Sequence, residues 1–165
     1  MRLDRTAGRP YVREVGSAQS THSLPRWVPY FNLIARPILA AGVPLGPDVL
    51  ITVRGRRTGR PRTTPLTLCQ HPGRRGLISP FGETHSVRNL RAAGRATIRL
   101  GSRSEETRAI ELAPAEAAEF IRQVVAPQAR RSRFGNWFVR NIDRIDIDDP
   151  VEAAKGRPVF ELLPM

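Results

Sequence analysis

The sequence has few of the residues that metal, disulfide or nucleophile chemistry requires. Cys69 is its only cysteine, which excludes an intramolecular disulfide and a cysteine-based metal site. The three histidines, His22, His71 and His85, lack the spacing of metal ligands, and we expect no metal. No Gly-x-Ser-x-Gly or His-Glu-x-x-His motif is present. If the protein is an enzyme, these absences favour a bound cofactor as the carrier of its reactivity.

Long apolar runs are also missing. Without a signal peptide or about 20 consecutive apolar residues, we expect a cytoplasmic protein that does not span a membrane. Any membrane contact is expected to be peripheral, through the first predicted helix and the net charge. A length of 165 residues suits one domain. Residues 1–22 are polar and aperiodic, which predicts a mobile leader, and residues 23–165 are expected to form a single domain.

Lysine is nearly absent and acidic residues are outnumbered. Lys155 is the only lysine among 27 basic residues, and the formal net charge is +12. Such a charge favours an anionic partner: nucleic acid, membrane phosphate or a polyanionic small molecule. The preference for arginine also fits GC-rich codon usage, in which case part of the charge has no function.

Five arginines are concentrated in one short turn. In VRGRRTGRPRTTPL, residues 53–66, arginine occupies positions 54, 56, 57, 60 and 62. Gly55 and Gly59 permit positive φ and a close approach of the backbone to a ligand, and guanidinium groups recognise phosphate and carboxylate through paired donors. The ending of a Walker loop is missing. The segment therefore predicts a site for a ligand with several negative charges along a chain. The alternative is a solvated basic hairpin tip.

The pattern of apolar residues predicts a small α+β barrel. Strands are expected at 49–53, 63–70, 77–80, 95–100, 107–112 and 158–163, with turns at 54–62, 71–76 and 101–106. Helices are expected from Ser23 to Ile38, at 84–94 and from Pro114 to Val125. Residues 134–142 suit a short helix or an irregular aromatic segment, and the acidic 143–149 suits a solvated turn. Five or six mostly antiparallel strands with two or three flanking helices favour a barrel over an alternating βαβ sheet.

Three segments together resemble one known family. They are VLITVRGRRTGRPRTTPL (49–66), LISPFGETHSVRNLRAAGRATI (77–98) and PVFEL (158–162). They are similar to the deazaflavin (coenzyme F-420)-dependent nitroreductase/quinone reductase family. Its usual form is a Gly-Arg-Lys/Arg-Ser/Thr-Gly-x-x-Arg-x-Thr-Pro-Leu turn, a serine at a strand end and an Asn-Leu-Arg/Lys-Ala helix. The resemblance implies a split β-barrel, flavin-reductase-like and FMN-binding-like. It also implies binding of coenzyme F-420, a deazaflavin with a ribityl chain, a phosphodiester and an oligoglutamate tail. FMN is a less expected cofactor.

The resemblance also implies which residues bind the cofactor. The turn and the next strand would hold the phosphate, the tail carboxylates and the underside of the ring, through Arg56, Arg57, Thr58, Gly59, Arg60, Pro61, Arg62, Thr64, Pro65 and Leu66. A second group would line the ring edge: Ser79, Pro80, Gly82, Ser86, Val87, Asn89 and Leu90. Ser86 stands where relatives usually carry tryptophan, which removes a large wall of the pocket. We predict a substrate wall of Trp27, Tyr30, Phe31, Phe134 and Trp137, and we assign no catalytic residue.

The activity that the resemblance implies is hydride transfer from reduced F-420 to a small-molecule acceptor. The acceptor would be a quinone, a nitro compound or an activated double bond. One alternative is a non-catalytic protein that binds F-420 or a flavin, which the serine at position 86 favours. A basic nucleic-acid module is a further alternative, but the arginines lack interleaved aromatic residues, so we expect no nucleic-acid partner. We expect a monomer or a homodimer.

Overall fold

The computed structural model describes residues 48–141 and 143–165, together with Pro37 and Ala41. The predicted leader, residues 1–22, lies outside the described residues. So does nearly all of the predicted first helix, with Trp27, Tyr30 and Phe31.

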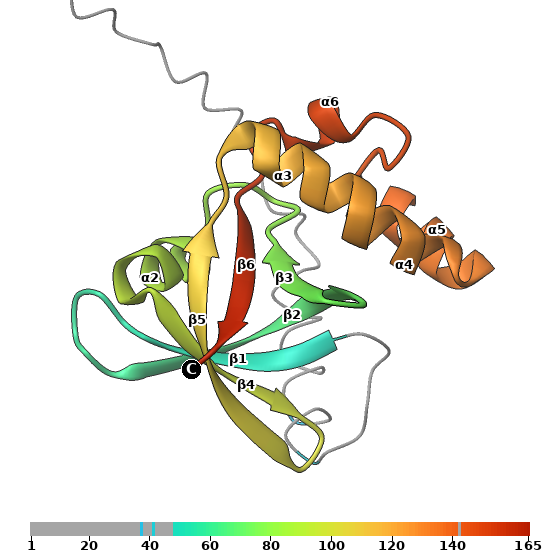
Figure 1. Cartoon of the computed structure of the whole chain (residues 1–165). Helices are drawn as coiled ribbons and strands as arrows, with labels where there is room; N and C mark the ends of the chain where they lie inside the picture. The colour runs from blue at the N-terminus through green and yellow to red at the C-terminus, as the bar shows by residue number, and fades with distance from the viewer. Residues whose placement is uncertain (1–36, 38–40, 42–47, 142) are drawn as a thin grey trace, which may run out of the picture.

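Six antiparallel strands form a closed barrel (Figure 1). They are β1 (Asp48–Arg54), β2 (Pro61–His71), β3 (Arg74–Ile78), β4 (Arg95–Leu100), β5 (Arg103–Glu111) and β6 (Val159–Pro164). Their order around the barrel is β1-β2-β3-β6-β5-β4, and the pairing of β1 with β4 closes it. Closure pairs both sides of every strand, so the barrel leaves no open sheet edge. The predicted α+β split barrel is confirmed.

Helices cover one end and one flank of the barrel (Figure 1). They are α2 (His85–Ala93), α3 (Pro114–Phe120), a single π-helical turn η1 (Ile121–Val125), α4 (Ala126–Arg130), α5 (Arg133–Asn141) and α6 (Pro150–Ala154). The prediction of two or three helices was too low. The helix that begins at Pro114 passes through Pro127, which is the second residue of α4 after the π-helical turn. Proline has no N–H for the regular α-helical hydrogen bond, and the hydrogen-bond pattern changes in this part of the helix. The short α6 follows Asp149, whose carboxylate accepts a hydrogen bond from the Glu152 N–H.

Two predicted turns are shorter than the sequence suggested. The chain reverses at Pro72–Gly73 and at Gly101–Ser102, and the strands then begin at Arg74 and Arg103. At the start of β3 the charged residues have carboxylate partners on β6 and β5. Arg74 lies 2.7 Å from the Glu161 carboxylate, and Arg75 lies 2.5 Å from that of Glu105.

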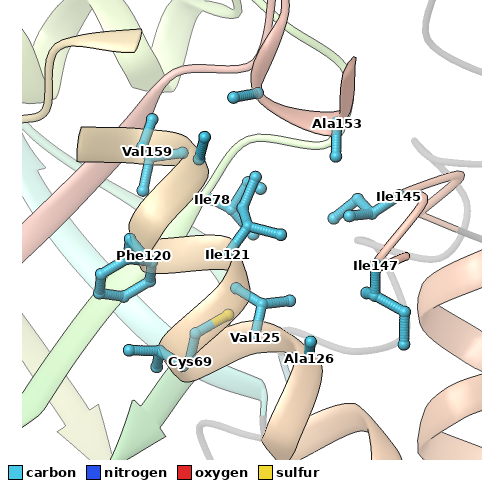
Figure 2. Packing of buried hydrophobic residues seen from close by; sticks show 14 of the residues in the cluster. Cys69, Ile78, Phe120, Ile121, Val125, Ala126, Ile145, Ile147, Ala153 and Val159 are labelled. Carbon is cyan, nitrogen blue, oxygen red and sulfur yellow. The ribbon is translucent and has the colours of Figure 1, made fainter. Parts of the chain in front are cut away.

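The apolar residues form two separate cores. One fills the barrel, where Val87 and Leu90 of α2 pack among the inward-facing strand residues. The other lies outside the barrel, between the strands and α3, η1 and α4 (Figure 2). Phe120 and Ile121 are fully buried in this outer core. The outer core holds the long helix against the barrel, while α2 packs on the barrel interior.

Candidate cofactor-binding site

The arginine turn is a tight loop at the end of the β1–β2 ladder. The last paired residues are Arg54 and Pro61, so the loop proper spans residues 55–60. The Gly55 N–H donates to the Arg60 carbonyl at 2.9 Å, and the Gly59 N–H donates to the Gly55 carbonyl at 2.8 Å. Gly59 has φ of 67°, a conformation that favours glycine. This compact backbone displays Arg56, Arg57 and Arg60 at the surface.

Helix α2 contacts the arginine turn directly. The backbone N–H of Arg56 donates to the side-chain oxygen of Asn89 at 3.2 Å, and Figure 1 shows the turn at the same side of the barrel as α2. The helix begins at Thr84, whose hydroxyl accepts from the Val87 N–H, and ends at Gly94 with φ of 63°. The caps fix where α2 begins and ends, and the hydrogen bond between Arg56 and Asn89 places the Asn-Leu motif beside the turn.

A narrow cavity lies between α2 and the barrel wall. Its floor is buried and apolar: Ile51, Val53, Leu77, Ile78, Val87, Leu90 and Phe160. Its rim is partly exposed and mostly polar: Arg62, Thr64, Leu66, Thr84, Ser86 and Asn89. Buried Ser79 also lines it, and its hydroxyl donates to the Gly82 carbonyl at 2.8 Å. The Thr64 and Ser86 hydroxyls form a hydrogen bond of 3.2 Å across the rim.

The size of this cavity limits what can enter it. Its volume is about 30 Å³, which leaves room for a few water molecules at most. A tricyclic ring system cannot be enclosed there with α2 in this position. A ring must rest at the polar rim or displace the helix.

The arginines of the turn are free to bind an anionic ligand. Within the described residues, the guanidinium groups of Arg56, Arg57, Arg60 and Arg62 form no ion pair with a carboxylate. Desolvated or exposed guanidinium groups remain charged at any physiological pH. The turn therefore presents four cations, and the rim beside it carries hydroxyl and amide groups.

Arg91 differs from these arginines, because its guanidinium group forms ion pairs with two carboxylates. Its guanidinium lies 2.9 Å from Glu83 and 2.5 Å from Glu111. Hydrogen bonds to Glu111 and Glu83 raise the pKa of Arg91, and the bond from Arg91 holds the pKa of the Glu83 carboxyl below its usual range. Arg91 therefore ties α2 to the barrel and is not free for a ligand.

The structure brings about half of the predicted cofactor residues to the cavity. Those that line it are Arg62, Thr64, Leu66, Ser79, Ser86, Val87, Asn89 and Leu90. Arg56, Arg57, Thr58 and Arg60 lie in the neighbouring turn, and Pro80 and Gly82 lie in the loop after β3. Gly59 and Pro61 line a different cavity. Pro65 is buried but does not line the cavity beside Leu66, because neighbouring residues of a strand point to opposite faces.

Several lining residues were missed by sequence reasoning. Ile51, Val53, Leu77, Ile78 and Phe160 carry no local signal for a site, since only barrel closure brings their strands together. Thr84 could have been found, because a threonine directly before a helix is a typical N-cap.

Phe134 and Trp137 do not reach the cavity. Residues 134–142 were expected to form a helix or an irregular segment, and α5 confirms the helix. The two rings stack with centroids 6.1 Å apart and are 70% and 52% exposed. Figure 1 shows α5 on the far side of the molecule from α2. The structure therefore gives no support to these two residues as a substrate wall.

No helix in the described part of the chain is long and apolar enough to cross a membrane. The same residues contain no group of three or more His, Cys, Asp or Glu side chains arranged to hold a metal ion.

Comparison with known proteins identifies one matching family and several solved structures of low sequence identity. Residues 39–143 match the family described as F-420H2-dependent quinone reductase. The heme storage protein HutZ from Vibrio cholerae is 17% identical, with 78% of this chain and 89% of that chain covered and a TM-score of 0.50. A solved F-420-H2 dependent reductase is 18% identical, with coverages of 71% and 94% and a TM-score of 0.43. No protein of curated function matches the sequence. At these identities the structural likeness to HutZ concerns the fold alone.

Proposed function

The chain belongs to the F-420H2-dependent quinone reductase family, and we propose that it transfers a hydride from reduced coenzyme F-420 to a quinone. The family makes it an oxidoreductase that binds F-420. Nitro compounds and activated double bonds are further acceptors that we propose for the same chemistry. A quinone that receives the hydride also takes up one proton and leaves as the hydroquinone, while the cofactor leaves oxidised.

The observation that carries this proposal is the group of arginines beside the rim. Arg56, Arg57 and Arg60 lie at the surface without carboxylate partners in the described chain, and Arg62 stands at the rim itself. F-420 offers a phosphodiester and several carboxylates, which suit guanidinium donors. We assign the phosphodiester to this turn and the ring to the rim of the narrow cavity. The donor set therefore fits the cofactor.

Hydride transfer requires the chain to hold the cofactor close to the acceptor and to stabilise the negative charge that develops on the acceptor. The reduced deazaflavin supplies the hydride when it is bound, and the protein must hold it close to the acceptor. Thr64 and Ser86 present hydroxyl groups at the rim, and a hydroxyl can donate a hydrogen bond to an oxygen that gains negative charge. We assign this stabilising role to the hydroxyl pair, and we assign proton delivery to water.

We expect the protein to bind F-420 more tightly than FMN, NADPH or DNA. Of the three small molecules, only F-420 combines a phosphodiester with a row of carboxylates, so it can engage more of the arginines at once. Titrations of the purified protein at one salt concentration would measure the four dissociation constants. Tighter binding of FMN would contradict the assignment of the cofactor site.

Turnover distinguishes an enzyme from a non-catalytic binder. With reduced F-420 and a short-chain, water-soluble quinone, we expect quinone-dependent return of the absorbance of oxidised F-420. Tight F-420 binding without any such oxidation, tested also with nitroaromatic acceptors, would favour the non-catalytic alternative.

Replacing Ser86 with tryptophan is expected to change F-420 affinity or acceptor preference several-fold. Ser86 lines the rim and its hydroxyl bonds to that of Thr64, so an indole there would contact whatever rests on the rim. Burial of one aromatic side chain contributes roughly 1.5–3 kcal/mol. The measurement is the F-420 dissociation constant together with rates on a panel of quinones and nitroaromatics.

Two control variants isolate the effect of the indole. Ser86→Ala removes the hydroxyl without adding bulk, and Ser102→Trp adds an indole at the exposed β4–β5 turn. If Ser86→Trp left affinity and all rates as in the parent protein, position 86 would not face the ligand.

A further inference from the structure

Helix α5 presents an exposed aromatic face. Of the Phe and Trp side chains that the structure describes, only Phe134 and Trp137 are exposed, and both lie on this helix. The ring of Phe138 lies 6.0 Å from that of Phe134 and extends the group toward the protein body. Neighbouring apolar side chains that remain exposed on a folded protein mark a surface where something binds. We call Phe134 and Trp137 the aromatic face of α5.

The opposite side of α5 is fixed to the body of the protein. Val139 packs against the outer core, and its carbonyl accepts a hydrogen bond from the Ile145 N–H at 3.0 Å. A Cβ atom on Gly135 would lie 3.1 Å from the Ala129 carbonyl oxygen, so α5 passes close to the end of α4. Figure 1 shows α5 beyond this end of the long helix, outside the barrel. These contacts hold the aromatic face outward.

Unpaired positive charge lies beside the aromatic face. Residues 126–141 include four arginines and no acidic residue. Two of these arginines, Arg130 and Arg140, form ion pairs with Asp148. The other two, Arg131 and Arg133, are exposed and form no ion pair within the described residues. Arg133 precedes Trp137 by four positions, so both lie on one face of the helix.

This combination of side chains suits the surface of a membrane. Helices that lie in the plane of a bilayer surface carry Trp, Phe or Leu on one side and Arg or Lys beside them. Tryptophan is enriched at the level of the lipid headgroups, because its ring is apolar and its N–H is polar. Guanidinium groups pair with phosphate through two parallel donors. An anionic phospholipid bilayer is therefore complementary to α5 in both apolarity and charge.

The size of the helix disfavours a protein partner, including a second copy of this chain. The nine residues of α5 form a face of roughly 14 Å by 10 Å, or about 140 Å². A stable protein interface buries roughly 800 Å² on each partner. A bilayer needs no such area or shape complementarity, since it deforms around the side chains and attracts each arginine at a distance.

We propose that α5 docks the protein on the surface of a bilayer that contains anionic phospholipids. Phe134 and Trp137 enter the headgroup region, and Arg131 and Arg133 contact lipid phosphates. No residue of α5 lines the narrow cavity, and Figure 1 shows α5 on the far side of the molecule from α2. Docking through α5 therefore leaves the arginine turn open to the aqueous phase. The inference does not depend on the cofactor that the turn binds.

Sedimentation of the full-length protein with vesicles tests the docking surface. Phe134→Gln and Trp137→Gln remove apolar area without changing the net charge, and Arg133→Gln removes one charge. Leu100→Gln is the apolar control, because Leu100 is 41% exposed at the end of β4. Arg103→Gln is the charge control, because Arg103 is exposed on β5 without an ion pair in the described chain.

We expect the parent protein to bind vesicles of phosphatidylcholine mixed with phosphatidylglycerol, and to bind pure phosphatidylcholine far more weakly. Arg133→Gln should weaken binding roughly fivefold, which corresponds to about 1 kcal/mol for one arginine at an anionic surface. Phe134→Gln and Trp137→Gln should each weaken it at least as much, because each ring contributes its apolar area. Both control variants should bind like the parent protein.

Tryptophan fluorescence identifies the segment that enters the lipid. The sequence has two tryptophans, Trp27 and Trp137, so Trp27→Phe leaves Trp137 as the reporter, and Trp137→Phe leaves Trp27. Lipids with brominated acyl chains quench a tryptophan that enters the bilayer surface. We expect strong quenching of Trp137. Quenching of Trp27 alone would assign the contact to the N-terminal segment and overturn docking through α5.

Other outcomes also overturn the inference. Equal losses from Arg133→Gln and Arg103→Gln, or full binding by both aromatic variants, would mean that the net charge alone attracts the vesicles. Equal binding to pure phosphatidylcholine would contradict the role of the arginines. If the parent protein ignored vesicles and Trp137→Gln abolished its self-association in sedimentation velocity, the face would belong to a second copy instead. The α5 variants should bind F-420 like the parent protein, so failure of the proposed function would leave vesicle binding unchanged.

Discussion

Replacing Arg62 with glutamate is expected to weaken F-420 binding at least tenfold. Arg62 stands at the rim of the narrow cavity and pairs across the ladder with Val53. The change removes a forked donor and puts a negative charge beside an anionic ligand. A hydrogen bond to a charged group contributes roughly 1.5–3 kcal/mol, and tenfold in affinity corresponds to about 1.4 kcal/mol. Arg57→Glu, in the exposed part of the turn, should cause a loss of similar size.

The affinity of a shortened cofactor shows which group of the ligand each arginine contacts. For an arginine that serves the phosphodiester, the loss should be the same with and without the glutamate tail. For one that serves the tail, the loss should shrink when the tail is absent. High salt should reduce every loss, because the turn is exposed and the Debye length is about 10 Å at 0.1 M salt.

Arg131→Glu is the matched control for these reversals. Arg131 is exposed beside α5 and forms no ion pair within the described part of the chain. Figure 1 shows this region on the far side of the barrel from the turn. It should leave F-420 affinity within twofold. Equal losses from Arg62→Glu and Arg131→Glu would mean that the whole basic surface attracts the ligand, and the nucleic-acid alternative would gain support.

Phe120→Ala is expected to lower the free energy of unfolding by about 3–5 kcal/mol. Phe120 is fully buried in the outer core (Figure 2). A Cβ atom on Gly76 would lie only 2.5 Å from its ring, so the ring packs directly on the β3 backbone. The Arg74 guanidinium lies 5.2 Å from the ring centre, a distance at which a cation is attracted to an aromatic face. Truncation would remove all of these contacts and leave a cavity.

The control for this prediction is the same substitution at an exposed site. Phe134 on α5 is 70% exposed, and Phe134→Ala should change stability by less than about 0.5 kcal/mol. Denaturant unfolding of both variants and the parent protein would measure the difference. Similar midpoints for Phe120→Ala and the parent protein would show that the long helix does not depend on this ring.

The parts of the site with local signals were predictable from the sequence. Glycines and arginines between two β-branched runs indicated the turn at residues 54–62, and the structure confirms a loop between β1 and β2. Gly94 indicated the end of α2 and adopts the left-handed conformation there. These signals depend on the conformational preferences of neighbouring residues, which act before any tertiary contact forms.

Boundaries that depend on distant partners were not predictable. The strands beginning at Arg74 and Arg103 were interpreted as turns, since charged residues seldom indicate strands. Arg74 is satisfied by Glu161, far along the chain. The helix through Pro127 was expected to end earlier, because proline usually terminates a helix.

The sequence by itself indicated five or six strands, the position of α2 and the positive charge of the arginine turn, since each is encoded within a few neighbouring residues. Only the tertiary structure decided which faces meet. Barrel closure brought Phe160 beneath the rim and separated Phe134 and Trp137 from it. Because side chains alternate between the two faces along β1 and β2, Arg62 lines the narrow cavity and Arg54 lines the cavity that Gly59 and Pro61 also line. The physical reason is that a strand has two faces, and its local pattern does not say what packs on either until the sheet closes.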